Sequence, residues 1–204
     1  MKLDAFIIGG GVSGLSCALV LGSAHTKIFA QNKKIALIAH QKASALQDAI
    51  FYNAYGIHAG TLGSELLITS TAHLSESYPH ISQITNEKVI KIEGAYPDFL
   101  VITNKATYNT AIVVVGIGSA NTFDIEGLMD YVEGHQKALP IKNRIQLKNI
   151  DHKVNEGIYV IGTLAGWRSQ LAIAAGSGAS VATDILTLWN EGEQTHSHDS
   201  IRKK

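Results

Sequence analysis

Apolar residues gather in four short runs that are well separated along the chain. These runs occupy residues 5–8, 34–39, 110–115 and 158–161, and three of them end directly at a glycine. Strands that are covered on both faces of a parallel sheet show such runs, without the alternation that half-buried strands display. The pattern therefore predicts a parallel sheet in the interior of the protein.

Segments with helical spacing lie between or after these strands, at residues 14–22, 61–77 and 170–189. Thr61 is a suitable N-cap for the second helix, with Glu65 in its first turns. Three further short strands follow each other closely and predict an antiparallel meander, at residues 88–93, 99–103 and 105–108. This order predicts an α/β fold with a central parallel sheet, helices on one face and the small meander, at about 86–108, on the other.

The remaining segments carry weaker signals. Residues 23–33 extend the first helix or form an extra turn, and residues 43–60 are expected to be loop with at most one helical turn. A strand is expected at 144–147. The chain is expected to form one domain over residues 1–190, followed by a flexible polar tail at 191–204.

Composition narrows the class of protein further. The 204 residues are 46% hydrophobic and 17% charged, with 17 basic and 17 acidic side chains, so the charge gives no reason to expect a nucleic-acid partner. Cys17 is the single cysteine, which excludes an internal disulfide, a zinc cluster and a Cys-x-x-Cys pair. His196 and His198 lack a third ligand, so no metal site is predicted. Without a signal-peptide pattern or an apolar run of membrane-spanning length, the protein is expected to be cytoplasmic, with no membrane partner.

The clearest chemical signal is the segment Gly9-Gly10-Gly11-Val12-Ser13-Gly14, which fits G-x-G-x-x-G between a strand and a helix. Gly9 permits a sharp turn, Gly11 lets a pyrophosphate approach the backbone, and Gly14 lets the helix pack tightly on the strand. The free N–H groups and partial positive charge of a helix N-terminus favour phosphates. The motif predicts dinucleotide binding at Gly9, Gly11, Val12, Ser13 and Gly14.

One expected partner of this motif is missing. An acidic residue normally ends the second strand and binds the adenosine ribose, but Ala39 stands there. His40 or Gln41 could bind the ribose instead. Alternatively, Lys42 with His40 could face the 2′-phosphate of NADP.

Two segments together resemble the FAD domain of thioredoxin reductase-like pyridine nucleotide-disulfide oxidoreductases. One is Ile7 to Ser16, and the other is Gly157 to Gly162 followed by Gln170-Leu171-Ala172-Ile173-Ala174-Ala175-Gly176-Ser177-Gly178. The stretch 113–118 is similar to the strand that closes the FAD site, and Tyr52 to Gly56 loosely resembles the loop near the isoalloxazine. The similarity extends over nearly the whole chain and implies a Rossmann-like FAD-binding domain.

The resemblance implies further cofactor-binding residues. Gly162 and Thr163 would hold the ribityl chain. The isoalloxazine would lie at Asn53, Gln170 and Leu171. Gly116 and Val89 are the other two candidate cofactor-binding residues. Tyr52, Tyr55 and Trp167 are weighed as flavin neighbours or as ordinary packing. Gly176 and Gly178 suggest a close approach of their helix to the flavin or the sheet, although packing alone would explain them.

The departures from the family bear on function. Thr163 replaces the usual aspartate, the NAD(P)H domain is missing, and so is the cysteine pair. The resemblance implies an FAD-dependent oxidoreductase that takes electrons from a redox partner protein, a free pyridine nucleotide or a small substrate, with a homodimer as a further expectation. Two alternatives stay open: an NAD(P)-binding enzyme or sensor, and a non-catalytic module that kept the fold.

Overall fold

The computed structural model describes residues 2–39, 44–195 and 197. Its main sheet has eight strands: β1 (Leu3–Ile8), β2 (Ile35–Ala39), β5 (Ile81–Thr85), β6 (Val89–Ala95), β7 (Asp98–Thr103), β8 (Thr107–Val115), β11 (Lys153–Asn155) and β12 (Ile158–Val160). Two small hairpins pair β3 (Ile50–Phe51) with β4 (Thr61–Leu62), and β9 (Val132–Gly134) with β10 (Ile145–Leu147). The α-helices are α1 (Val12–Ser23), α2 (Gly63–Ser77) and α3 (Leu171–Trp189), and the 3-10 turns are η1 (Ala24–Thr26), η2 (Ala45–Asp48), η3 (Met129–Tyr131), η4 (Pro140–Lys142) and η5 (Gly162–Ala165).

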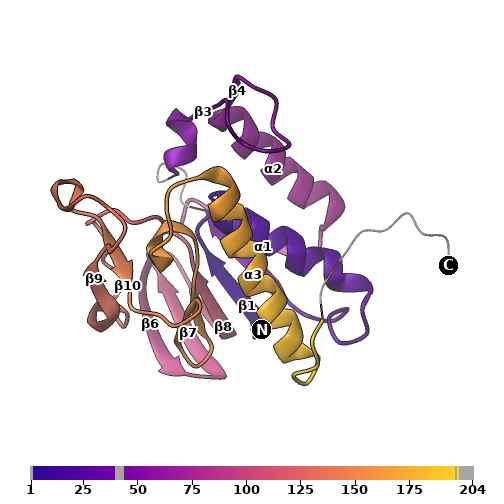
Figure 1. Ribbon diagram of the computed structural model, residues 1–204. Helices are drawn as coiled ribbons and strands as arrows, with labels where there is room; N and C mark the ends of the chain where they lie inside the picture. Colours follow the sequence, from indigo (N-terminus) through magenta and orange to yellow (C-terminus); the bar gives the residue numbers. More distant parts are fainter. Residues whose placement is uncertain (1, 40–43, 196, 198–204) are drawn as a thin grey trace.

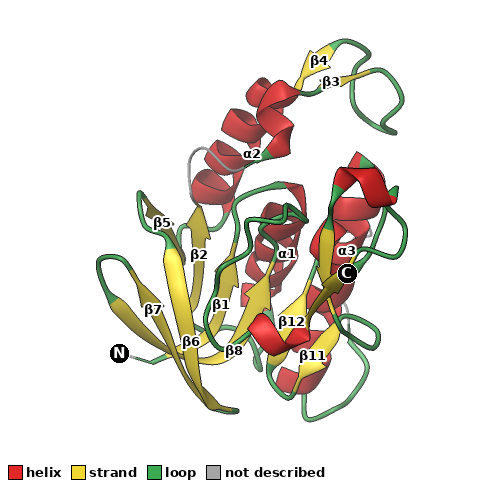
Figure 2. Ribbon diagram, turned by 90° about the vertical axis from the view of Figure 1, so that its left-hand side faces the viewer, coloured by secondary structure: helices red, strands yellow, loops and turns green. Residues whose placement is uncertain are grey.

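The main sheet runs in the order β11-β12-β8-β1-β2-β5, with β7 on β8 and β6 on β7. Four pairs of neighbouring strands are parallel: β1 with β2, β1 with β8, β2 with β5, and β8 with β12. Figure 1 shows the three helices on one side of this sheet and the meander of β6, β7 and β8 on the other. The hairpin β3–β4 stands beyond the end of α2 (Figure 2).

The burial of β1 explains its uninterrupted apolar run. Ala5 and Ile7 belong to the core beneath the helices, whereas Phe6 and Ile8 belong to the core beneath the meander. Successive side chains of a strand point to opposite faces, so a strand covered on both faces must be apolar throughout. The expected arrangement of helices on one face and meander on the other is therefore present.

Strand β8 joins two segments that the pattern predicts as separate strands. Its first residues pair antiparallel with β7, and its last residues pair parallel with β1 and β12. The predicted break at Asn109, between strands at 105–108 and 110–115, is wrong, because Asn109 and Thr110 both lie inside β8. Thr110 is fully buried, and its hydroxyl donates to the carbonyl of Ile112 at 3.0 Å, so it can stay in the core.

Thr61 does not cap α2. It lies in β4, and its hydroxyl donates to the carbonyl of His58 at 2.7 Å, while Leu62 precedes the helix without a side-chain cap. The helix begins at Gly63, where a Cβ atom would lie 1.9 Å from the carbonyl oxygen of Leu46. Close packing of the chain on η2 therefore sets this boundary, rather than capping chemistry.

Most other elements agree with the pattern, including the helices at 14–22 and 170–189 and the strand at 144–147. Strand β5 was not predicted. It pairs parallel with β2, with Ile81 opposite Ile35, and is the fifth parallel strand of the sheet. The pattern also fails to predict β3, β4, β9 and β11 (Lys153–Asn155). Residues 23–33 contain η1 and turns.

Helix α3 is an exception to the expectation that no apolar segment reaches membrane-spanning length. Its 19 residues, with a mean hydropathy of 1.5, are long and apolar enough to cross a membrane by length and composition. Core helices of soluble proteins pass the same test, and α3 buries Val181, Ala182, Ile185 and Leu186 against the rest of the fold. In this structure α3 is a packed helix beside α1 (Figure 1).

Candidate functional site

The turn after β1 is tied to both neighbouring strands. Gly9 has a φ of +117°, and a Cβ atom there would lie 2.4 Å from the carbonyl oxygen of Gly116. The Gly9 N–H donates to the carbonyl of Ile38 at 2.9 Å, and the Gly116 N–H donates to that of Ile8 at 2.7 Å. Conformation and space both require glycine at position 9, as the motif predicts.

The N-terminus of α1 leaves room for a side chain at Gly11 among the described residues. Gly11 is the N-cap, in extended conformation, and no side chain of the described residues caps the helix. The first turn contains no acidic residue. A Cβ atom on Gly11 would meet only the Ser44 hydroxyl, at 3.5 Å. The N–H groups at Val12 and Ser13 therefore start a helix whose positive end is available to an anion.

Gly14 and Ser13 hold α1 against the strand ends. A Cβ atom on Gly14 would lie 1.8 Å from the carbonyl oxygen of Gly9, so the close approach expected there is present. Ser13 is buried, and its hydroxyl lies about 3 Å from the positions that Cβ atoms would take on Gly116 and Gly162. Five predicted site residues thus come together where β1, β8 and β12 end.

The turn after β12 is fixed by α3. Gly162 has a φ of +68°, and its N–H donates to the hydroxyl of Ser177 at 2.8 Å, inside the protein. Thr163 follows in η5 and is half-buried. Ser177 was not singled out from the sequence, although its place between Gly176 and Gly178 in the recognised block was a signal.

Helix α3 begins at Leu171, with the exposed Gln170 as its N-cap. A Cβ atom on Gly178 would lie 2.0 Å from the carbonyl oxygen of Ser13, and the Ser16 hydroxyl donates to the carbonyl of Ala175 at 2.8 Å. The close approach expected at Gly178 is therefore to α1, not to the sheet.

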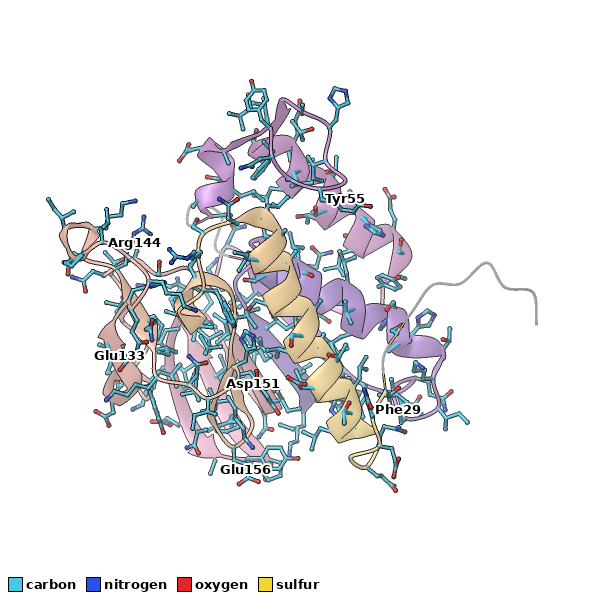
Figure 3. The ribbon with its side chains drawn as sticks, viewed as in Figure 1. Phe29, Tyr55, Glu133, Arg144, Asp151 and Glu156 are labelled. Carbon is cyan, nitrogen blue, oxygen red and sulfur yellow. The ribbon has the colours of Figure 1, made fainter. Side chains whose placement is uncertain are left out.

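Other predicted residues are not brought into this cluster. Asn53 lies exposed in the β3–β4 loop, the loop that also carries Tyr55 (Figure 3). Val89 is buried in the core on the meander side, so its side chain does not face the cluster. His40 and Gln41 lie outside the described residues, while Ala39 is half-buried beside Gly10.

A hollow of about 280 Å³ flanks α3 on the side of Trp167. Trp167 is 41% exposed; its ring lies 5.9 Å from that of His152, and the Lys137 ammonium lies 4.2 Å from its centroid. Burial, together with the carboxylate of Asp151, raises the pKa of Asp184 on the same helix. Trp167 therefore packs against His152 and the Lys137 ammonium at the edge of this hollow.

Thiol and metal chemistry find no support in the described residues. Cys17 is fully buried in α1, as expected, and burial raises the pKa of its thiol to about 12, so the reactive thiolate is not formed near neutral pH. The described part of the chain contains no group of three or more His, Cys, Asp or Glu side chains that could hold a metal ion.

Comparison with known proteins agrees with the resemblance found in the sequence. A family model described as "Pyridine nucleotide-disulphide oxidoreductase" matches residues 3–177. No curated protein matches this chain in sequence.

Several solved structures share the fold. The chain is similar to an oxidoreductase from Agrobacterium tumefaciens, with a TM-score of 0.73 and 14% identity over 95% of this chain and 100% of that one. It is also similar to a thioredoxin reductase from Gloeobacter violaceus, with a TM-score of 0.73 and 13% identity over 98% and 99% of the two chains. A ferredoxin-flavin thioredoxin reductase from Clostridium acetobutylicum has a TM-score of 0.68 and 17% identity, over 94% and 98%.

Proposed function

Because this chain belongs to the pyridine nucleotide-disulphide oxidoreductase family, we propose that it binds FAD and works as an oxidoreductase that depends on an external electron donor. Its fold is that of thioredoxin reductase-like proteins. Members of this family typically bind FAD.

The observation that carries the proposal is the open space at Gly11. Gly9 and Gly14 are packed so closely that no side chain fits, whereas a Cβ on Gly11 would touch only one hydroxyl. The bare turn and the uncapped start of α1 offer free N–H groups and a partial positive charge, which favour a pyrophosphate. The residues present therefore fit a dinucleotide.

The remaining assignments are those that the resemblance to the family implies. In the proposed complex the pyrophosphate contacts Gly11, Val12 and Ser13, and the ribityl chain passes Gly116, Gly162 and Thr163. The isoalloxazine lies at Gln170 and Leu171, with Asn53 near it. The adenosine lies towards His40, Gln41 and the main chain of Val89. Ligands of parallel α/β sheets bind at the carboxyl ends of the strands, where most of these residues stand.

The bound flavin would supply the electron-transfer chemistry, and the protein would hold and shield it. Cys17 cannot serve as a redox thiol because it is buried and un-ionised. The disulfide relay of the family is therefore closed to this chain. We propose that electrons come from a redox partner protein or from free pyridine nucleotide. A cytoplasmic location stays a prediction from the sequence.

Ala39 favours a second candidate. Without a carboxylate at the end of β2, the site does not repel a 2′-phosphate, and NADP becomes an alternative ligand. A non-catalytic module that keeps only the fold is the third reading. The affinity for each nucleotide distinguishes these candidates.

The test begins with the spectrum of the purified full chain and the mass of any nucleotide released on denaturation. FAD binding predicts absorbance near 450 nm that dithionite bleaches, or recovery of this spectrum when apoprotein is titrated with FAD. Tighter binding of NADP than of FAD in calorimetry would support the second candidate. A colourless protein that binds neither nucleotide would refute both.

A pair of glycine variants locates the ligand. Gly11→Val places a side chain where the described residues leave room, so the fold should persist while the pyrophosphate is excluded and FAD affinity falls more than tenfold. Gly134→Val is the matched control, because a Cβ atom there meets nothing within 4 Å and Gly134 lies in β9, outside the proposed FAD site. Equal FAD affinity in Gly11→Val and the unmodified protein would contradict the assignment.

A further inference from the structure

The loop that joins β9 to β10 combines positive charge with exposed apolar side chains. Its residues 135–144 include Lys137, Lys142 and Arg144 but no aspartate or glutamate, although the whole chain has a formal charge of zero. At the tip of the loop, Leu139 is 64% exposed and Ile141 is 92% exposed. Apolar side chains surrounded by charge on an exposed surface are a mark of protein interaction sites.

The positive charges of this loop are not neutralised within the described residues. No ion pair involves Lys142 or Arg144 there. Neither of the two acids that flank the hairpin, Glu133 and Asp151, forms an ion pair in this part of the structure. Glu133 instead accepts hydrogen bonds from the amides of Gln146 at 2.8 Å and Gln136 at 3.3 Å. Figure 3 shows Arg144 at the outer end of the hairpin, away from Glu133.

The loop is held in one shape by its own hydrogen bonds. The His135 N–H donates to the carbonyl of Arg144 at 2.9 Å, and the Lys142 N–H donates to that of Leu139 at 2.9 Å. The Gln136 N–H donates to the side-chain oxygen of the buried Gln146 at 3.0 Å. A preformed loop loses little conformational entropy when it binds a partner.

The same hairpin contacts the segment beside the proposed flavin site. The Lys137 ammonium lies 4.2 Å from the centre of the Trp167 ring. Gln146 packs on Gly166, where a Cβ atom would lie 2.7 Å from its side-chain oxygen. Gly166, Trp167 and the exposed Arg168 connect Thr163 to Gln170, so a partner on this loop would stand beside the segment proposed to border the flavin.

We propose that the β9–β10 loop, together with Trp167 and Arg168, is the docking surface for an acidic electron-carrier protein that reduces the flavin. The proposal rests on the proposed function and names its donor. Unpaired cations steer a negatively charged partner to the site and orient it. The apolar tip then adds hydrophobic contacts once the partner is bound. Each reduced carrier gives one electron, so two docking events with two protons from water complete one two-electron reduction.

The shape and the apolar content of the loop favour a protein as partner. Binding sites for small molecules such as NADPH are concave, whereas this loop projects from the body of the molecule (Figure 1). A membrane surface requires a broad apolar face or a lipid chain for firm attachment, and the tip offers mainly Leu139 and Ile141. Neither alternative explains the contact between Lys137 of the loop and the Trp167 ring.

The test uses the full chain and a plant-type ferredoxin as an acidic one-electron probe. Lys142→Glu and Arg144→Glu reverse single charges on the loop. Lys105→Glu is the matched control, because Lys105 is exposed in the turn between β7 and β8, at the end of β8 opposite Gly116. Binding is measured by biolayer interferometry at low and high salt, and flavin reduction by stopped-flow absorbance at 450 nm.

We expect each loop variant to weaken ferredoxin binding about tenfold at low salt, and Lys105→Glu to leave it unchanged. Salt should weaken binding of the unmodified protein and remove the difference. Dithionite, which needs no docking, should reduce the flavin equally in all variants. Equal ferredoxin binding by the loop variants and the control would overturn the proposal.

Two other outcomes would also overturn it. Loop variants that lose binding to phosphatidylserine vesicles but not to ferredoxin would assign the loop to membranes, and variants that lose only NADP binding would assign it to a nucleotide. Absence of bound flavin would refute the proposed function separately, since the binding measurement needs no flavin.

Discussion

The contact between Gly178 of α3 and Ser13 of α1 offers a direct test of how the site is built. A Cβ atom on Gly178 would lie 2.0 Å from the Ser13 carbonyl oxygen and 3.1 Å from the Cys17 nitrogen. Both neighbours are backbone atoms, which cannot rotate aside. Gly178→Ala should therefore force the two helices apart by roughly 1 Å.

The expected cost follows from two opposing effects. Overpacking of this kind costs about 1–3 kcal/mol, and better helix propensity of alanine returns less than about 1 kcal/mol. For a chain of this length, about 1 kcal/mol shifts Tm by roughly 2–4 °C, so Gly178→Ala should lower Tm by several degrees. FAD affinity should fall as well, because Ser13 belongs to the proposed pyrophosphate turn.

Gly176→Ala is the internal control on the same helix. Nothing lies within 4 Å of a Cβ atom there, and the position is exposed, so alanine should raise stability by about 0.5–1 kcal/mol through helix propensity alone. Both variants are compared by thermal unfolding of the apoprotein followed by circular dichroism. If the two substitutions shift Tm in the same direction and by the same amount, the close packing of α1 on α3 is refuted.

Three further predictions concern single groups. Ser177→Ala leaves the buried Gly162 N–H without its acceptor and should cost about 1–3 kcal/mol in urea unfolding, whereas Ser180→Ala on the exposed side of α3 should cost less than about 0.5 kcal/mol. Burial raises the pKa of the Cys17 thiol from 9.0 to about 12, so between pH 9 and about pH 12 the unfolded chain ionises there and the folded one does not. Stability should then fall by about 1.4 kcal/mol per pH unit more than in Cys17→Ala, and identical pH profiles would contradict the burial. Ala39→Glu should raise FAD affinity about tenfold or more through hydrogen bonds from the ribose hydroxyls to a carboxylate, measured by titration of apoprotein; weaker FAD binding would place the ribose elsewhere.

Local patterns in the chain were sufficient for the elements near the proposed pyrophosphate. An apolar strand, three spaced glycines and a helix of small residues constrain each other within about twelve residues, so they can be recognised without the rest of the fold. The separate strand expected before Thr110 shows the limit of such patterns. Asn109, between the two apolar runs, indicates a break on its own, but partners on three other strands keep β8 continuous.

The positive end of α1, the need for glycine at position 9 and the absence of a thiol pair follow from the order of residues alone, because they depend on backbone conformation and composition. Three other features do not follow from the order of residues. They are the close approach of Gly9, Ser13, Gly116 and Gly162, the hydrogen bond of Ser177, and the contact of the charged loop with Trp167. Each joins segments that are far apart in the chain, and a hydrogen bond or close contact of this kind exists only after the sheet has brought the strand ends together.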